Sequence, residues 1–484
     1  MMENMLSEKG LNFNDLEKEI FKIGCEIASS LLGQVLNRMD EHIELTRDKK
    51  RYRHKGTRTT TLKTLMGEVS YSRTVYETEL KNGEKAYIYL LDQALKLETF
   101  GKVTASLATR IAESASVCSY RETAANVSSM TGQIISHGGV WNVIQDLGEK
   151  LSEVEITNAQ LAKNSQGKGN IITPILFEEA DGVWINMQGK ARPKKGRKCE
   201  MKMAVAYDGW ELKSKGRYAL RNKVMVCGFE EPKEFQRKKE GAIAAKFNTD
   251  EITIRILNGD GGGWIKGGLV DDDVHFQLDP FHKNREILRK VQDIKQRETV
   301  LRLLSEKRIK DLLLYIKGIT ELAEDEVEKK KLKELYEYFR NNKEGLIPYQ
   351  ERELKLPTPP EGLEYRNLGT MEHQVCDGAA KRMKHQKASW SKQGATNLGR
   401  ILCKKACGNL RETVTTLSKT VLPERYTETI EEVLSAAKAP LRDGRGYQYP
   451  VTGKSPFTET FVTNGRKAIL SMLSDRNCTE LIYR

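Results

Sequence analysis

The sequence contains few cysteines and no long apolar run. Its eight cysteines are scattered over 484 residues, and no two of them form a C-x-x-C pair. This spacing argues against a disulfide framework and against a zinc finger, so we expect a protein of a reducing compartment. No apolar stretch reaches the roughly 18 residues that a membrane-spanning helix needs. Residues 1–10 include Glu3 and Glu8 and lack an apolar segment, so the sequence predicts no secretory signal.

Acidic residues are outnumbered by basic ones. The chain has 80 Lys and Arg against 67 Asp and Glu, which gives a formal net charge of +13 and a pI of about 9.1. Such a surplus favours a polyanionic partner, because neutralising phosphates releases their counterions. A basic protein without such a partner is the alternative. The positive charge is concentrated in Arg47–Lys63, in Lys190–Lys198 and around Lys381, Arg382 and Lys384.

The length predicts two to four domains, and residues 1–98 form the first candidate region. Apolar residues recur at intervals of three and four over residues 12–44, which predicts a helix. The alternating segments Thr59–Leu65 and Glu68–Tyr76 predict a β-hairpin that carries basic side chains.

Residues 99–160 have the pattern of a helix-turn-helix domain. Ser119 and Glu122 form a capping-box pattern, followed by a short helix over Arg121–Ser128, a break around Gly132 and a second helix capped by Ser136. In a helix-turn-helix, the second helix enters the major groove. An ordinary helix pair is the alternative. We expect 100–155 to bind DNA without metal, through Arg121, Ser136 and His137.

Residues 165–400 change to strands and form a candidate α/β core. Strand segments are predicted over Ile171–Phe177, Val183–Met187, Met201–Tyr207, Lys223–Cys227, Ile252–Leu257 and Val274–Leu278, with a charged helix over Pro232–Phe247. Three strands, a helix, a strand, a helix and a strand is the order of an RNase H-like core with a mixed sheet. Residues 281–345 predict an all-helical insertion whose basic face contacts DNA or a second protomer, and 401–484 form a C-terminal region.

Three acids stand where such a core needs them. Asp181 lies on the first strand, Asp260 ends the fourth, and Glu372 begins the helix after the insertion. Gathered carboxylates are hard oxygen ligands that suit Mg²⁺ or Mn²⁺. Two such ions, about 3.5–4 Å apart, activate an attacking hydroxyl and stabilise the leaving oxygen of a phosphodiester. A surface position is the alternative for each acid, and Glu178, Glu179 or Asp279 is an alternative metal ligand.

Other residues near these acids have two interpretations. His282 can order the site or contact the scissile phosphate, and Arg285 can hold a phosphate; alternatively, both only begin the insertion's first helix. His373 is equally ambiguous. The glycines 261–263 lack the Gly-Lys-Ser/Thr ending of a P-loop, so no nucleotide site is expected there. Cys403 and Cys407 have no nearby histidine pair and are expected in the core.

The sequence resembles the ISLre-type insertion-sequence transposases, often grouped as an uncharacterised bacterial protein family and similar in core plan to the Mutator-like DDE transposases. The resemblance covers nearly the whole chain. Its motifs are specific in combination: Glu179–Trp184, Gly259–Gly261, Leu278–His282, Gly369–His373, Arg382–Lys384 and Ser389–Ser391.

This resemblance implies a metal-dependent transposase with Asp181, Asp260 and Glu372 as its acidic triad and two Mg²⁺ or Mn²⁺ ions as cofactors. The implied partners are the terminal inverted repeats of the element and target DNA, bound by a homo-oligomer in the bacterial cytoplasm at the nucleoid. We expect DNA contacts from His282, Arg285, Lys381, Arg382 and Lys384. The alternatives are a non-catalytic DNA-binding regulator that keeps the core as a scaffold, and a nuclease of the same fold.

Overall fold

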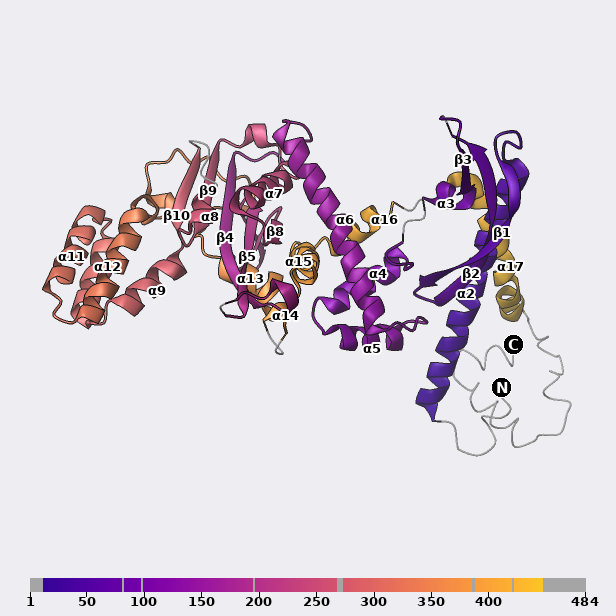
Figure 1. Cartoon of the computed structure of the whole chain (residues 1–484), viewed down its shortest axis with the longest axis horizontal. Coiled ribbons are helices and arrows are strands. Elements are labelled where there is room, and N and C mark those ends of the chain that lie inside the picture. The colour runs from indigo at the N-terminus through magenta and orange to yellow at the C-terminus, as the bar shows by residue number, and fades with distance from the viewer. Residues whose placement is uncertain are drawn as a thin grey trace. The chain divides into compact units, whose positions relative to one another are not determined.

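The computed structural model describes residues 12–80, 82–96, 99–194, 196–267, 273–384, 388–419 and 422–446. The chain divides into two compact units, Met1–Leu97 with Thr420–Arg484 and Glu98–Lys419 (Figure 1). The residues predicted to form a helix-turn-helix domain and those predicted to form the α/β core thus belong to one unit. No helix in the described ranges is both long enough and apolar enough to cross a bilayer.

The first unit packs helices against a three-stranded antiparallel sheet of order β1-β2-β3. Its elements are α2 (Phe13–Thr46), β1 (Arg53–Thr64), β2 (Gly67–Glu79), β3 (Lys85–Tyr89), α3 (Leu90–Leu95), a 3-10 turn (Glu424–Tyr426) and α17 (Thr427–Gly446). The predicted N-terminal helix and hairpin are confirmed, and β3 is an additional strand. Asp40 of α2 is buried and accepts hydrogen bonds from the backbone N–H and the hydroxyl of Thr74, which fixes α2 on β2.

The second unit contains a five-stranded mixed sheet of order β10-β9-β4-β5-β8. The strands are β4 (Ile175–Asn186), β5 (Lys198–Tyr207), β8 (Val224–Gly228), β9 (Ile254–Gly259) and β10 (Val274–Leu278). β5 is antiparallel to β4 and β8, whereas β9 runs parallel to β4 and β10 parallel to β9. β4 begins four residues later than predicted, because Pro174 has no N–H to donate to a neighbouring strand.

Successive side chains of each strand point to opposite faces of this sheet. We name each face after a residue of β4 that points to it: the Ala180 face and the Asp181 face. On the Ala180 face, the apolar side chains pack against Phe235 of α7 (Pro232–Ala244) and Ile265 of α8 (Gly263–Lys266). On the Asp181 face, a Cβ added to Gly378 would lie only 2.9 Å from the methyl carbons of Met203 and Met225. The sheet is therefore covered on both faces.

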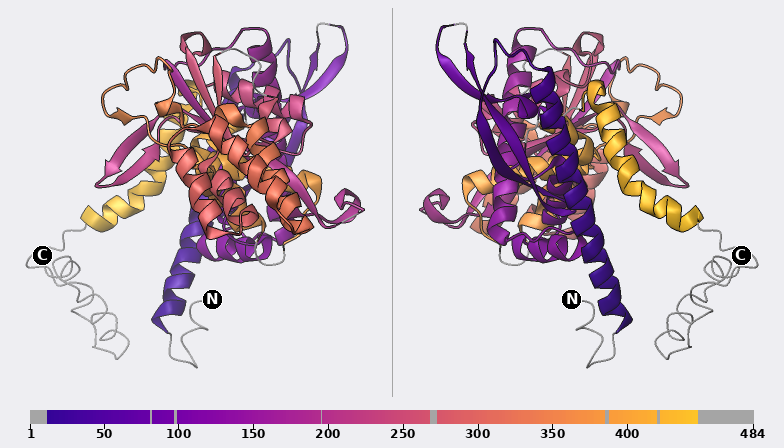
Figure 2. Two further views of the ribbon diagram at one scale, coloured as in Figure 1. Left: turned by 90° about the vertical axis from the view of Figure 1, so that its left-hand side faces the viewer. Right: turned by 90° about the vertical axis from the view of Figure 1, so that its right-hand side faces the viewer.

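The segment predicted to be an all-helical insertion is helical. It contains α9 (Pro280–Lys290), α10 (Ile294–Ser305), α11 (Ile309–Leu322), α12 (Glu326–Asn341) and a 3-10 turn (Lys343–Gly345). Residues of α9–α12, among them Ile287, Leu312 and Phe339, are buried in the same core as the Ala180 face. Figure 2 shows these helices side by side in front of the sheet. The block thus extends the core of the sheet.

Three helices precede the sheet: α4 (Ala105–Ala115), α5 (Tyr120–Met130) and α6 (His137–Lys163). The capping box of Ser119 and Glu122 is present, and Ser136 caps α6 by accepting a hydrogen bond from the Gly139 N–H. α6 extends to Lys163, and its second half packs against the core. Arg400 of α15 (Lys392–Ala406) donates to Glu155 of α6 at 2.7 Å.

A hairpin between β5 and β8, together with the elements after the insertion, completes the second unit. A small sheet of order β11-β6-β7 combines β6 (Trp210–Ser214), β7 (Arg217–Leu220) and β11 (Leu363–Glu364). The predicted helix near residue 370 is divided into α13 (Met371–Val375), a π-helical turn (Cys376–Ala380) and α14 (Lys381–Met383), and α16 (Leu410–Ser418) ends the unit. The β6–β7 hairpin was not predicted.

A buried ion network connects the Ala180 face to α7. Glu178 is 1% exposed and binds Lys239 at 2.5 Å and Arg255 at 2.6 Å. Burial alone would raise the pKa of the Glu178 carboxyl, but Arg255 and Lys239 lower it to about 2. Arg255 also binds Glu240, which is 38% exposed. The carboxylate of Glu178 is thus ionised inside the core because two cations contact it.

We predict that Glu178→Gln lowers the free energy of unfolding by about 3–5 kcal/mol at pH 7, because it leaves two buried cations without their shared carboxylate. Urea unfolding monitored by circular dichroism measures this. Since the pKa is lowered, the stabilisation is present above the ordinary value of 4.5 and is lost as the pH falls through about 2. Glu240→Gln, the half-exposed control, should cost about 1 kcal/mol or less; equal losses for the two variants would contradict the prediction.

Candidate active site

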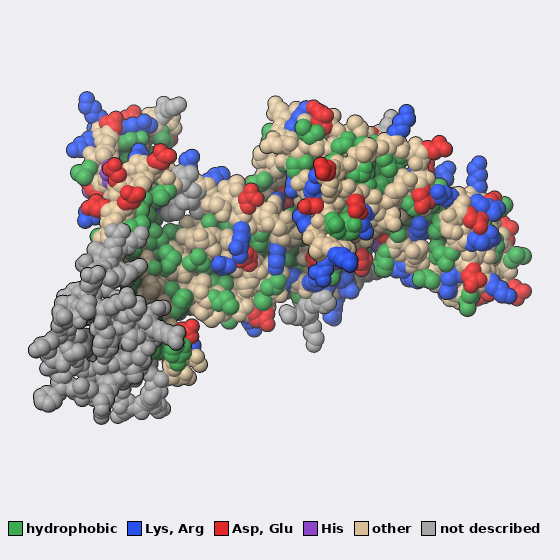
Figure 3. Space-filling model, turned by 180° about the vertical axis from the view of Figure 1, so that it is seen from behind, with side chains coloured by type: hydrophobic (Ala, Val, Ile, Leu, Met, Phe, Trp, Pro, Cys, Tyr) green, Lys and Arg blue, Asp and Glu red, His purple; other side chains and the backbone are tan. Residues whose placement is uncertain are grey.

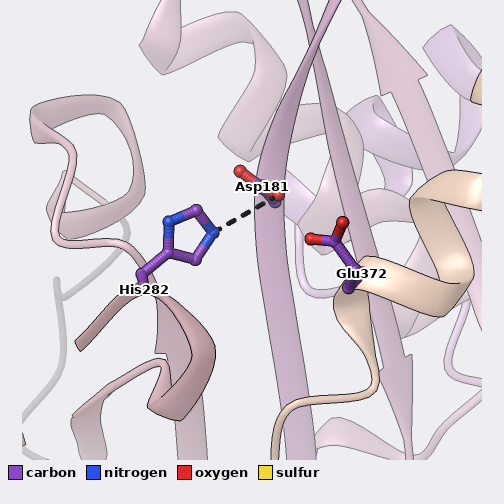
Figure 4. A group of neighbouring side chains, drawn as sticks. All are labelled: Asp181, His282 and Glu372. Atoms are coloured by element: carbon purple, nitrogen blue, oxygen red, sulfur yellow. Dashed lines mark ion pairs between the residues drawn. The ribbon is translucent and has the colours of Figure 1, made fainter. Parts of the chain in front are cut away.

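Asp181, His282 and Glu372 meet at one end of the sheet. A carboxylate oxygen of each acid and a ring nitrogen of the histidine all lie within 4.8 Å of one another. Asp181 comes from β4, His282 from the first turn of α9, and Glu372 from the first turn of α13, and the three side chains converge (Figure 4). The side chains of Asp181 and His282 are 16% and 13% exposed, whereas Glu372 is exposed. The cluster is therefore open to solvent on the side of Glu372.

The imidazole of His282 contacts two neighbours, and its backbone contacts a third. Its Nε2 lies 3.6 Å from an Asp181 oxygen, and its Nδ1 lies 3.0 Å from the Arg285 guanidinium. The Asp181 carboxylate raises the pKa of His282, against the effect of burial. Asp279 caps α9 by accepting hydrogen bonds from the N–H groups of Phe281 and His282. His282 thus begins the first helix of the insertion and also lies in the cluster, and its contact with a scissile phosphate stays a prediction.

Glu372 reaches the cluster because Glu179 binds the start of α13. The fully buried carboxylate of Glu179 accepts hydrogen bonds from three successive backbone N–H groups, those of Gly369, Thr370 and Met371, at 2.9, 2.9 and 3.2 Å. It also accepts from the Thr370 hydroxyl at 2.5 Å and from the Tyr207 hydroxyl at 2.6 Å. Backbone N–H groups at a helix start favour a negative charge, so β4 carries the group that places α13.

Asp260 lies beside the cluster and is not one of its members. Ala180 of β4 pairs with Gly259, the last residue of β9. Asp181 and Asp260 directly follow these paired residues. The Asp260 carboxylate accepts a hydrogen bond from the Gly262 N–H at 2.8 Å, which turns it toward its own loop. Among the described residues, the group of close ligand atoms contains Asp181 and Glu372 without Asp260. The three predicted acids thus reach the same end of the sheet, but only two of them converge.

A fourth acid, Glu200 of β5, lies near Asp181 and Asp260 and was not predicted. A Cβ at Gly182 would lie within 1.9 Å of its Oε1, so the Glu200 carboxylate covers this glycine. Burial raises the pKa of Glu200, and the negative charges of Asp260 and Asp181 raise it further. Only the antiparallel register of β4 and β5 brings Glu200 here, so the sequence alone carried no signal for it.

The three alternative metal ligands are occupied by other contacts. Glu178 points to the opposite face and binds Lys239 and Arg255. Glu179 binds the start of α13, and Asp279 caps α9 while its second oxygen accepts from Asn258 at 2.8 Å. Glu179 and Asp279 therefore position the elements that carry Glu372 and His282.

The residues predicted to contact DNA have different environments. Arg121, Ser136, His137 and Lys384 are exposed, and Lys381 is exposed and paired with Asp377. Arg382 instead donates to the Ala115 carbonyl at 2.7 Å and lies over the rings of Tyr120 and Trp390. Its side chain joins α14 to α4 and α5, and its contact with DNA stays a prediction.

The remaining ambiguous residues lie outside the cluster. His373 is mostly exposed and contacts Asp377 at 3.0 Å. Cys403 is buried in the core, as predicted, and Cys407 is half-buried at the end of α15.

Over the face drawn in Figure 3, Lys and Arg side chains lie among acids, with a larger basic group in the lower middle part. The positive charge is thus not confined to one patch.

The donor set fits a divalent cation. Two carboxylates provide oxygen ligands, which Mg²⁺ and Mn²⁺ prefer, and a neutral imidazole adds a nitrogen that suits transition metals. Asp181 and Glu372 have no basic partner other than His282 within ion-pair distance among the described residues. Their negative charge is therefore available to a cation.

We predict that the full-length protein binds Mn²⁺ at this cluster. Asp181→Asn and Glu372→Gln each remove one charged ligand and should weaken binding about tenfold or more, that is by about 1.4 kcal/mol. Electron paramagnetic resonance of free Mn²⁺ during titration measures this. The control is Asp377→Asn, five residues after Glu372, whose carboxylate binds Lys381 and His373. A control that loses as much affinity as the two test variants would contradict the assignment.

We also predict that Glu179→Gln destabilises the start of α13. Loss of the charge that three N–H groups share should lower the free energy of unfolding by about 2–3 kcal/mol. Hydrogen exchange should speed up at the amides of 370 and 371, as measured by mass spectrometry or NMR. Tyr207→Phe removes one donor of the same carboxylate and leaves those amides bound. Unchanged exchange in Glu179→Gln would show that this carboxylate does not hold α13.

Comparison with known proteins gives one family over most of the chain. UPF0236 protein TTE2489 of Caldanaerobacter subterraneus subsp. tengcongensis is 24% identical over 440 residues, which cover 90% of this chain and 87% of the relative. A relative from the same organism, whose name joins eleven designations from TTE0033 to TTE2212, is 23% identical over 90% of this chain and 86% of its own length. The UPF0236 protein in the vanSb 3′ region of Streptococcus gallolyticus is 24% identical over 80% of this chain and 81% of its own. Residues 6–420 match the family described as "Uncharacterised protein family (UPF0236)", to which this chain therefore belongs.

Proposed function

We propose that the protein is a DDE transposase of a bacterial insertion sequence, which cleaves the ends of its element and joins them to target DNA. The observation that carries this proposal is the convergence of Asp181 and Glu372, which are 191 positions apart in the chain, at one open end of the mixed sheet. A protein that only binds DNA has no need of buried groups that bring two carboxylates together.

The strand arrangement supports an RNase H-like core. In chain order the five strands are β4, β5, β8, β9 and β10. Across the sheet they lie in the order β8-β5-β4-β9-β10, so the first strand in the chain is the central one. The first three are antiparallel neighbours, and the last two run parallel to the first. This order and these directions are the ones expected of such a core, with Asp181 on the central strand.

The proposed chemistry divides the work among the cluster residues. Divalent ions bound there would activate the attacking hydroxyl and stabilise the leaving oxygen of the phosphodiester. Asp181 and Glu372 would hold the ions, and Asp260 and Glu200 add negative charge beside them. His282, oriented by Asp279 and Arg285, would donate a hydrogen bond to a phosphate oxygen when Asp181 is engaged by the metal.

The name of one relative also supports the proposal. It joins eleven designations within a single strain. One protein that carries many designations is what an element that copies itself within a genome would produce. A gene with a fixed cellular role gives no reason for such repetition. We propose that this protein, likewise, acts on DNA in the bacterial cytoplasm and binds there as a homo-oligomer.

We predict Mg²⁺- or Mn²⁺-dependent cleavage of element-end DNA by the full-length protein. Asp181→Asn, Asp260→Asn and Glu372→Gln should each reduce cleavage and strand transfer to background, because the first and third remove a carboxylate of the cluster and the second removes the negative charge beside it. Duplex ends with the flanking donor sequence serve as substrate, and denaturing gels resolve the products. Asp250→Asn, which changes an exposed acid outside the cluster, should cleave at the parental rate.

The same assay separates the alternatives. Cleavage without joined products would indicate a nuclease of the same fold. Metal-independent binding with no cleavage by the parental protein would indicate a DNA-binding regulator. If Asp260→Asn cleaves at close to the parental rate while the other two variants do not, Asp260 is not a ligand, and Glu200→Gln becomes the variant to measure.

A further inference from the structure

A groove with a basic lining runs past the active-site helix on its other side. Its first part, about 730 Å³ in volume, is lined by the β6–β7 hairpin, by α13 and by the end of α15. Three lysines line it: Lys223 just before β8, Lys246 just after α7, and Lys405 in α15. None of the cluster residues Asp181, His282 and Glu372 lines it, so this groove is distinct from the metal cluster.

The three ammonium groups of the groove have only neutral acceptors. Lys223 donates to the amide oxygen of Gln374 at 2.9 Å, Lys246 to the Lys223 carbonyl at 3.2 Å, and Lys405 to the Ser116 hydroxyl at 2.6 Å. Within the described ranges, no carboxylate lies within 4.0 Å of any of them. An ammonium has three N–H donors, so each lysine keeps donors and an uncompensated charge for an anion.

The positive charge extends to the floor of the groove. Burial raises the pKa of the Cys407 thiol, while the charges of Lys223, Lys404 and Lys246 act in the opposite direction. Burial lowers the pKa of Lys223, and the negative charge of Asp377 acts against this effect. These groups create a positive potential at the end of α15, where an anion would be stabilised.

The groove continues away from the active-site helix toward the helix pair. A second hollow of about 520 Å³ shares Lys405 and Ala406 with the first and is lined by Ser116, Val117 and Lys381. Ser116 and Val117 lie between α4 and α5. Asp377, the acid in this part, is paired with Lys381 and His373. An elongated path with separate cations matches a chain of phosphates better than one small anion.

The groove and the metal cluster share α13. Thr370 and Gln374 line the groove, while Glu372 between them points into the cluster. Gln374 is 6% exposed and binds Lys223, and Thr370 binds Glu179. A phosphate held by Lys223 would therefore lie on the helix that supplies Glu372, and one DNA strand can reach both places.

We propose that this groove binds the phosphodiester backbone of the DNA that the cluster acts on, with Lys223, Lys246 and Lys405 as its phosphate contacts. This inference rests on the proposed function for its substrate, but its contacts can be tested without any cleavage. The proposed ligand is the row of singly charged phosphates along a DNA strand. Free inorganic phosphate carries the same kind of anion, so the experiment must distinguish the two.

The experiment is lysine footprinting of the full-length protein without divalent metal. An amine-reactive acylating reagent is applied alone, with element-end duplex, or with inorganic phosphate at the same total phosphate concentration, and peptides are quantified by mass spectrometry. We expect the duplex to reduce labelling of Lys223, Lys246 and Lys405 several-fold, while Lys163 and Lys233 keep their labelling. Both control lysines are exposed and lie outside the groove.

A second measurement uses the double variant Lys223→Gln/Lys246→Gln against the control Lys163→Gln/Lys233→Gln, which changes the net charge equally. The slope of log affinity against log salt should decrease by about 1.8 in the test variant, at about 0.9 per phosphate contact, and stay unchanged in the control. Protection by inorganic phosphate but not by duplex would make the groove a free-anion site and overturn the proposal. Equal labelling with and without duplex, or equal slopes in the two variants, would also overturn it. Protection in a protein that never cleaves DNA would leave the groove assigned and refute only the transposase.

Discussion

Two adjacent buried carboxylates on the central strand determine how the second unit is assembled. Glu178 and Glu179 point to opposite faces of β4, because side chains alternate along a strand. Glu178 binds cations from α7 and β9 on one face, and Glu179 binds the start of α13 on the other. Burying an ionised acid is costly unless its oxygens are fully engaged, so each carboxylate strongly selects the position of the element it contacts.

The position of the candidate site follows from this arrangement. Asp181 is two residues after Glu179 and on the same face, and α13 is bound just before Glu372. His282 arrives from the other direction, because Asp279 caps α9 at the end of β10 and contacts Asn258 of β9. The cluster residues are thus held by a layer of acids that is itself satisfied by hydrogen bonds. This layer leaves the charges of Asp181 and Glu372 free for a cation.

The helical block and the groove extend the same plan outward. The block α9–α12 adds its apolar side chains to the core of the Ala180 face, so it fixes the position of α9 and hence of His282. On the Asp181 face, the π-helical turn after α13 lets Gly378 pack closely against Met203 and Met225, and it directs the chain toward α14 and the helix pair. The groove follows this course. A strand of DNA bound along it would contact the helix pair and the cluster through one continuous surface of the unit.

Local sequence patterns determined the elements of this protein, and its tertiary structure decided the composition of the site. Periodicity and capping residues suffice for the N-terminal helix, the hairpin, the capping box at Ser119 and the helical insertion, because these depend on neighbours within a few residues. Asp181 and Glu372 were also recognisable, since an acid inside an apolar strand is unusual and Glu372 follows a helix start.

The partners of these acids could not be read in the same way. The place of Glu200 over Gly182 depends on the register of β4 and β5, and the turn of Asp260 away from the cluster depends on one N–H of its own loop. The role of Glu179 depends on hydrogen bonds to groups 190 to 192 residues further along the chain. A sequence specifies which side chains are present and which surfaces they must bury, but distances between groups this far apart in the chain are fixed only when those surfaces pack.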